Sequence, residues 1–110
     1  MVSQDSILYI GLQLGGIVSV DLGGRRIRTD KKCPQLPANY SIISLYETRD
    51  GTIWAGTSGN GSYFLRPGAD RWQQLIGKIH GADIAFCFDF AEQGDTLWMA
   101  TTGFLNQFQN

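Results

Sequence analysis

The stretch Ile53-Trp54-Ala55-Gly56-Thr57, which is followed by Gly59-Asn60-Gly61, decides the fold because it recurs along the chain. The other two copies are Leu8-Tyr9-Ile10-Gly11-Leu12 before Gly15-Gly16, and Leu97-Trp98-Met99-Ala100-Thr101 before Gly103. Tyr9 and Trp54 are 45 residues apart, and Trp54 and Trp98 are 44 residues apart. A repeat of about 40–50 residues that holds several short strands is typical of a β-propeller blade.

The middle copy contains the strands of one complete blade. Their predicted ranges are Ser41–Glu47, Thr52–Thr57, Ser62–Leu65 and Asp70–Leu75. Asp50-Gly51 lies between the first two strands and is a strong hairpin signal, because both residues tolerate positive φ.

A helix is the alternative for the outer part of this blade. Trp72, Leu75, Ile76 and Ile79 have helical spacing, and Asp70 would cap such a helix. Gly77 interrupts the pattern, and the phase of the repeat places an outer strand here, so we favour the strand.

The predicted fold class is all-β: a β-propeller fragment of about two and a half four-stranded antiparallel blades in one partial domain, residues 1–110. We expect the end of a first blade in 6–32, a whole blade in 40–76 and part of a third in 82–110. An incomplete ring leaves blade faces bare. We therefore expect a longer parent protein that supplies the remaining blades, or association between copies of the chain, and we favour the longer protein.

Several predicted strands are apolar on both faces, which indicates that each sheet lies between two others. These are Ile7-Leu8-Tyr9-Ile10, Ile42-Ile43 and Ile84-Ala85-Phe86-Cys87-Phe88. The rings of Tyr9, Trp54 and Trp98 would then occupy equivalent positions between blades. An isolated chain would expose large apolar faces and would associate.

Composition excludes several classes of protein. Of 110 residues, 43% are apolar and 17% charged, which excludes a disordered charged tail. A net charge of −1 disfavours a general nucleic-acid binder, so no nucleic-acid partner is expected. No apolar run is long enough for a membrane span, and the first residues lack the pattern of a signal peptide, so this segment is expected to make no membrane contact.

The reactive side chains form no catalytic or metal-binding set, and no cofactor is predicted. Cys33 and Cys87 cannot build a disulfide framework; we interpret them as buried thiols, with a single bridge as the alternative. His80 is the only histidine, and one His with two distant Cys has no metal-site spacing. Asp50 and Asp95 could be paired glycosidase acids, but their equivalent turn positions favour hairpin formation.

The most basic segment, Arg25-Arg26-Ile27-Arg28-Thr29-Asp30-Lys31-Lys32, permits two interpretations. Its positive charge could attract an anionic ligand. The alternation of arginine and isoleucine is explained more simply by an outer edge strand that is protected from further pairing.

The middle repeat resembles a known family. Ile43 to Thr57, with Asp50-Gly51, Trp54 and Gly56-Thr57, is similar to the repeat of two-component-regulator propellers, which precede the membrane span of bacterial hybrid histidine kinases and some diguanylate cyclases. The third copy is less similar, and the first departs from the pattern because Tyr9 replaces Trp and Leu12 replaces Thr.

The resemblance implies a non-catalytic sensor that is periplasmic as part of a membrane-anchored receptor and binds a small molecule or a glycan fragment. We expect the binding face in the inter-blade connections, 31–39 and 76–82, and in the glycine turns near Gly15, Asn60 and Gly103. The candidate ligand-binding residues are His80, Lys31, Lys32 and Asn60. The alternatives are a protein-interaction scaffold and a piece of a propeller lyase or glycosidase.

Overall fold

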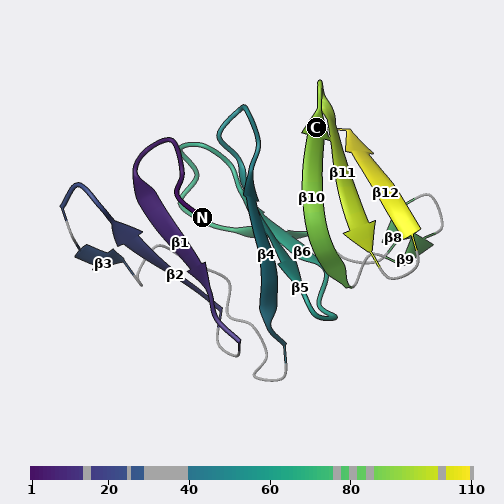
Figure 1. The fold of residues 1–110 in the computed structure, drawn as a ribbon, viewed down its shortest axis with the longest axis horizontal. Coiled ribbons are helices and arrows are strands. Elements are labelled where there is room, and N and C mark those ends of the chain that lie inside the picture. Colours follow the sequence, from purple (N-terminus) through teal and green to yellow (C-terminus); the bar gives the residue numbers. More distant parts are fainter. Residues whose placement is uncertain are drawn as a thin grey trace.

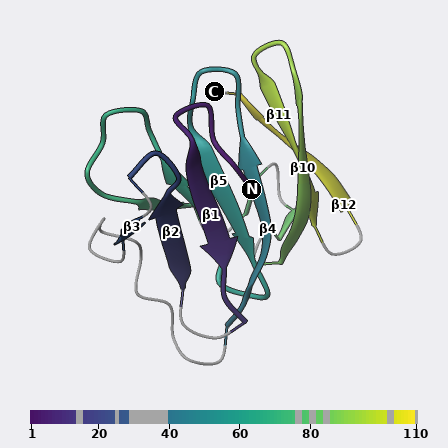
Figure 2. The same ribbon diagram turned by 60° about the vertical axis from the view of Figure 1, so that its left-hand side comes forward.

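Every regular element that the computed structural model describes is a β-strand. The structure describes residues 1–13, 16–24, 26–28, 40–75, 78–79, 82–83, 86–101 and 104–109. The all-β fold class is therefore confirmed. Figures 1 and 2 show the sheets standing side by side like the blades of a fan.

Three antiparallel sheets correspond to the three predicted blades. Blade 1 is β1 (Ile7–Gly11), β2 (Ile17–Asp21) and β3 (Arg26–Arg28); blade 2 is β4 (Ile42–Glu47), β5 (Ile53–Thr57), β6 (Ser62–Leu65) and β7 (Gln73–Leu75); blade 3 is β10 (Cys87–Gln93), β11 (Thr96–Thr101) and β12 (Phe104–Gln109). In each blade, strands that are consecutive in the chain are neighbours in the sheet. A two-stranded sheet, β8 (Lys78–Ile79) and β9 (Ala82–Asp83), lies between blades 2 and 3 in the chain.

The outer part of blade 2 is a strand, as favoured, although it is shorter than predicted. Gln73–Leu75 pairs with β6, and its backbone groups therefore find partners in the sheet rather than in a helix. The helical alternative is wrong, because residues 78–79 are also extended. In blade 1, β3 pairs with β2 at the edge of its sheet, which confirms the predicted edge strand at Arg26–Arg28.

The repeat is visible in the pairing register of the strands. Tyr9 lies opposite Ser19, Trp54 opposite Phe64 and Trp98 opposite Gln107, so each aromatic occupies the same place between two strands of its blade. At the start of blade 1, Val2 forms a bridge with Leu8 and stands where the first strand of the other blades would be.

Two apolar cores hold the blades together, one on each face of blade 2. Every residue of β5 is buried. Ile53 and Ala55 pack toward blade 1 with Ile17, whereas Trp54 packs toward blade 3 with Leu97 and Met99. The alternation of side chains along an extended strand therefore serves both interfaces at once.

The repeated aromatics occupy equivalent positions but are not equally buried. Trp54 is fully buried, stacks on Phe64 at 4.8 Å between ring centroids, and lies 6.0 Å from Phe90 of blade 3. Tyr9 faces blade 2 and meets Trp72 edge-on at 6.3 Å. Trp98 alternates with two residues that face blade 2, so it lies on the far face of blade 3 and is half-buried.

Burial on both faces, predicted for three strands, is wrong at particular residues. Ile10, Ile43 and Phe88 are 39%, 40% and 50% exposed. The pairing register shifts at Ile43 and again at Phe88, so each is the extra residue of a β-bulge, which redirects its side chain. Ile10 lies on the face of blade 1 that points away from blade 2, since it alternates with Tyr9.

Glycines at one repeat position let neighbouring blades approach closely. A Cβ atom at Gly56 would lie 3.1 Å from the Cβ atom of Cys87, and even nearer to its carbonyl oxygen. At Gly11 a Cβ atom would meet the Cβ atom of Ile42 at 2.8 Å. Gly56 in β5 thus meets the start of β10, and Gly11 in β1 meets the start of β4. The two glycines are 45 residues apart, so the same repeat position serves both interfaces.

We predict that Gly56→Ala destabilises the chain, because the methyl group would collide with the β10 backbone, which cannot move without disturbing the second core. Overpacking of this kind costs about 1–3 kcal/mol. Urea unfolding followed by tryptophan fluorescence measures the loss. The control is Gly24→Ala, where a Cβ atom would make only an ordinary contact of 3.6 Å with Asp21. Equal stability of the two variants would contradict the close-approach explanation.

The exposed apolar residues predict self-association of the isolated chain. Val2, Ile10 and Leu22 of blade 1 are all more than a third exposed. Light scattering after size-exclusion chromatography should give a mass above 12.2 kDa, and Ile10→Ser should lower the associated fraction more than Asp95→Ser does. A monodisperse monomer that binds no hydrophobic dye would speak against this expectation.

Candidate functional site

The turns of the three blades lie on two opposite edges of the fan. One edge, here called the hairpin edge, carries the turns 48–52 and 93–96 and the segment 3–6, all near the top of Figure 1. It also carries the β6–β7 connection, residues 66–72. The opposite edge carries the β5–β6 turn, residues 58–61.

The turn of blade 2 on the hairpin edge is tied together by Asp50. Its carboxylate accepts a hydrogen bond from the Thr52 backbone N–H at 3.0 Å and another from the Thr48 hydroxyl, while Gly51 has φ 88°. Asp95 follows Gly94, with φ 56°, in the equivalent turn of blade 3. The hairpin interpretation of both aspartates is therefore confirmed.

A glutamate at one repeat position links each blade to the one before it. Glu47 accepts a hydrogen bond from the Gln4 backbone N–H at 3.0 Å, and Glu92 accepts one from the Arg49 backbone N–H at 2.9 Å. The two donors, Gln4 and Arg49, are 45 residues apart, and so are the two acceptors, Glu47 and Glu92. The two contacts are therefore copies of each other in the repeat. Sequence reasoning missed this link, although the spacing of the two glutamates was a usable signal.

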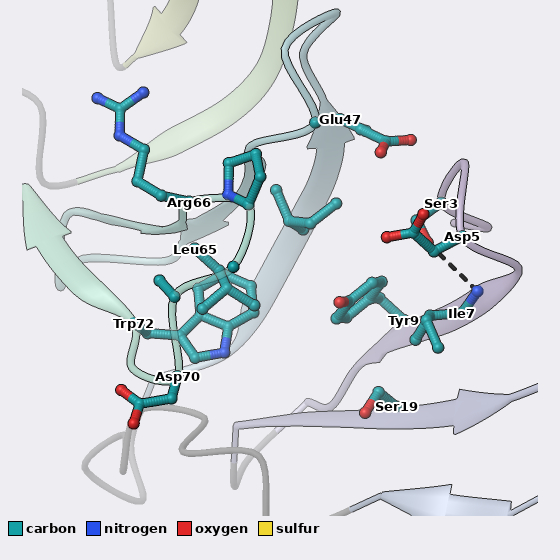
Figure 3. A pocket seen from close by; sticks show the side chains of 15 residues that line it. Ser3, Asp5, Ile7, Tyr9, Ser19, Glu47, Leu65, Arg66, Asp70 and Trp72 are labelled. Atoms are coloured by element: carbon teal, nitrogen blue, oxygen red, sulfur yellow. Dashed lines mark hydrogen bonds between the residues drawn. The ribbon is translucent and has the colours of Figure 1, made fainter.

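A cleft of about 390 Å³ opens between blades 1 and 2 on the hairpin edge. This first cleft has an apolar floor of Ile7, Ile53, Leu65, Tyr9 and Trp72, with Ser19 beside the rings. Figure 3 shows Tyr9 from β1 beside Trp72, which directly precedes β7 of blade 2, and the two rings meet edge to face. Ser3, Asp5 and Glu47 stand at its rim.

Trp72 contributes a polar group without a hydrogen-bond partner to the floor of the first cleft. The side chain is only 7% exposed, and its Nε1 atom is buried without a hydrogen-bond partner. In Figure 3 the ring nitrogen lies on the side of the indole that points into the cleft. Buried N–H groups are normally paired, so an acceptor placed in the cleft would be stabilised there.

The one basic side chain among the described residues of this lining is directed elsewhere. The Arg66 guanidinium lies 5.1 Å from the centre of the Phe64 ring and 3.7 Å from the Asp50 carboxylate. Figure 3 shows it pointing away from Tyr9 and Trp72. Asp5 and Glu47 therefore give the described rim a negative charge.

A second cleft, between blades 2 and 3 on the same edge, also measures about 390 Å³ but has different chemistry. Arg49 donates from Nη2 to the Gly94 carbonyl at 3.0 Å, and its Nε lies 4.0 Å from the Glu92 carboxylate. Arg49 and Glu92 thus pair with each other across the two blades, which makes the second cleft a polar seam between blades 2 and 3.

The comparison with known families supports the repeat. Residues 35–59 match the model of the two component regulator propeller family. The family resemblance is confirmed over this segment. It covers β4, the Asp50 turn and β5 with Trp54, which together form the inner half of the propeller blade described above.

Solved structures share the propeller fold across nearly the whole chain. One is described as the extracellular domain of a hybrid two component system, BT4673 of B. thetaiotaomicron, with TM-score 0.75 and 18% identity over 97% of this chain. The second, described as the extracellular domain of a one component system with the same designation, has TM-score 0.72 and 25% identity over 98%. The chain spans 14% of each of them. Among curated proteins there is no match.

Of the predicted ligand-binding residues, the structure describes one. Asn60 lies in the β5–β6 turn of the propeller repeat, on the edge opposite the two clefts, where its Nδ2 donates to the Tyr63 hydroxyl at 2.7 Å and its backbone N–H to Thr57. His80, Lys31 and Lys32 lie outside the described residues, as do 33–39 and the glycines at 15 and 103. Their proposed role stays a prediction.

The first cleft was not anticipated from the sequence. The repeat marks Tyr9 as one of its aromatics, whereas Trp72 is marked only as part of an outer strand or helix. The contact between Tyr9 and Trp72 depends on the packing of two blades, and no local sequence pattern predicts it.

The described part of the chain yields no group of three side chains suited to hold a metal ion. Within those same ranges, no helix has the length and apolar character needed to cross a membrane.

Cys87 is a free, buried thiol in the second core, and burial raises its pKa to about 11. Its Sγ donates toward the Asp89 carbonyl at 3.8 Å. A thiol with so high a pKa is a weak nucleophile at neutral pH, which fits the interpretation of Cys87 as a small apolar side chain. Cys33 lies outside the described residues.

We predict an alkaline loss of stability that depends on Cys87. The thiol of the unfolded chain, with its ordinary pKa of 9.0, ionises before the folded one, with its pKa near 11. The free energy of unfolding therefore has its full value below pH 9 and decreases as the pH rises toward 11. The decrease is about 2–3 kcal/mol. Urea unfolding at about pH 8 and about pH 10.5 should show a larger drop for the native chain than for Cys87→Ala. Equal drops would show that burial does not hold the thiol protonated.

Proposed function

We propose that the chain is a ligand-sensing propeller segment of a bacterial signal-transduction receptor, without catalytic turnover. It acts in the periplasm as part of a membrane-anchored protein, and it binds a small molecule or glycan fragment between blades. The observation that carries the proposal is the first cleft, where Tyr9 and Trp72 meet edge to face and a buried indole N–H lacks a partner. Pockets of this size with apolar walls and few polar groups are typical of ligand sites.

The comparisons support the sensory part of the proposal. The family matched by residues 35–59 is a propeller of two-component regulators, and both similar structures are described as extracellular domains of signalling systems. The remaining blades of the parent protein would complete the propeller. The ligand, those blades and copies of the chain itself are the partners we propose, with no nucleic acid among them.

A hydrolase role receives no support from the acids that the sequence made candidates. Asp50 is engaged by the Thr48 and Thr52 contacts of its turn, and Asp95 occupies the matching turn of the next blade. Asp50 therefore already has a structural role in its turn, and Asp95 lies at the tip of a hairpin.

A protein-interaction scaffold is the second candidate, favoured by one observation. Phe86 and Phe88 are 43% and 50% exposed, and their ring centroids lie 6.0 Å apart. Phe86 lies beside Gly59, which puts this aromatic pair toward the edge opposite the clefts. Exposed aromatic pairs are frequent in protein interfaces.

A thermal-shift panel tests the proposed function. The full chain is heated with each of a set of soluble oligosaccharides, and ligand and products are followed by chromatography in parallel. We expect at least one compound to raise the melting temperature, since a ligand at about 100 times its Kd stabilises the folded form by roughly 2.7 kcal/mol. We expect none to be cleaved. Cleavage would establish an enzyme, and a panel without any shift would favour the scaffold.

A further inference from the structure

The first cleft has features that specify more than the presence of a ligand. Its floor offers the rings of Tyr9 and Trp72, which meet at an interplanar angle of 82°. Two aromatic faces set nearly at right angles form an apolar corner. Such a corner favours ligands that have a flat apolar face, because their contact removes aromatic surface from water.

The polar groups of the cleft call for a ligand that both accepts and donates hydrogen bonds. The Nε1–H of Trp72 is a donor only, and it is buried without a partner. The ionised rim carboxylates of Asp5 and Glu47 can accept hydrogen bonds but cannot donate them. Glu47 uses Oε1 for the Gln4 backbone N–H, which leaves Oε2 available. A hydroxyl group satisfies both requirements, because it donates one hydrogen bond and accepts others.

The charges disfavour an anionic ligand. Among the described residues of the lining, the single cation, Arg66, is directed to Phe64 and Asp50. The carboxylates of Asp5 and Glu47 would repel a ligand carboxylate or sulfate brought into the cleft. The cavity volume of about 390 Å³ suits a ligand of one or two sugar-sized rings.

We propose that the first cleft is a binding site for an uncharged polyhydroxylated ligand and that it rejects acidic ligands of the same shape. This inference rests on the proposed sensing function and gives it a location and a charge preference. The apolar face of the ligand lies against Tyr9 and Trp72. One ligand hydroxyl accepts from the Trp72 indole, and others donate to Asp5 and Glu47.

Isothermal titration calorimetry of the full chain tests the charge preference. The probes are matched disaccharides: cellobiose with cellobiouronic acid, and α-1,4-galactobiose with α-1,4-digalacturonic acid, together with maltose and xylobiose. We expect binding of at least one neutral disaccharide and at least tenfold weaker binding of its acidic counterpart at low salt. The double variant Asp5→Asn, Glu47→Gln should reduce this difference, since it keeps the acceptor oxygens and removes the charges.

The location is tested by two matched substitutions. Trp72→Phe keeps an aromatic ring but removes the indole N–H, and it should weaken binding about tenfold, as expected for one lost hydrogen bond. Trp98→Phe is the control, because Trp98 lies on the far face of blade 3 and does not line the cleft. If Trp72→Phe does not fold, the ¹⁵N-labelled native chain replaces it. Its Trp72 indole resonance should shift on titration with the neutral disaccharide, while that of Trp98 stays in place.

The outcomes separate the two levels of the proposal. Tighter binding of an acidic disaccharide would overturn the charge preference and leave the sensing function intact. Binding that is unaffected by Trp72→Phe, or an indole resonance that does not move, would overturn the location. If no disaccharide of either kind binds, the charge preference and location are overturned, and the thermal-shift panel then decides independently whether the sensing function survives.

Discussion

The burial of β5 on both faces is the constraint on which the rest of the structure depends. An antiparallel sheet often exposes one face to water. The sheet that contains β5 lies between two other sheets, so this strand must be apolar on both sides. Ile53 and Ala55 enter one core and Trp54 the other. Gly56 then allows the backbone of the next blade to approach, since any side chain there would collide with Cys87. Close packing and two-sided burial are thus supplied by four consecutive residues.

The same repeat geometry has different consequences on the two faces of blade 2. Toward blade 3, a large indole fills the space between the sheets, and on the hairpin edge the second cleft is lined by the Arg49–Glu92 ion pair. Toward blade 1, Tyr9 is smaller than the tryptophan of the middle copy, and its partner Trp72 comes from the outside of the neighbouring blade. The first cleft, the one with an aromatic floor, lies at the interface where the repeat departs most from its pattern. Places where a sequence departs from the regular rules of its fold are often functional sites.

Much of the fold could be predicted because its signals are local or periodic. The 44–45 residue spacing, the Asp50-Gly51 turn and the apolar strands were sufficient for the four strands of blade 2 and for the order of the blades. The bulges at Ile43 and Phe88 were not predictable, since a bulge is a property of the pairing register and not of a single strand. For this reason exposure was misjudged at those residues.

The sequence by itself determined that the chain is built from repeated antiparallel blades, because turn chemistry and strand periodicity act between residues that are neighbours in the chain. Only the tertiary structure decided which surfaces meet. Tyr9 and Trp72 are 63 residues apart, and their meeting, with an indole N–H left unpaired, follows from how one sheet is placed against the next. That placement results from the summed packing of many side chains across an interface, and no short stretch of sequence encodes such a sum.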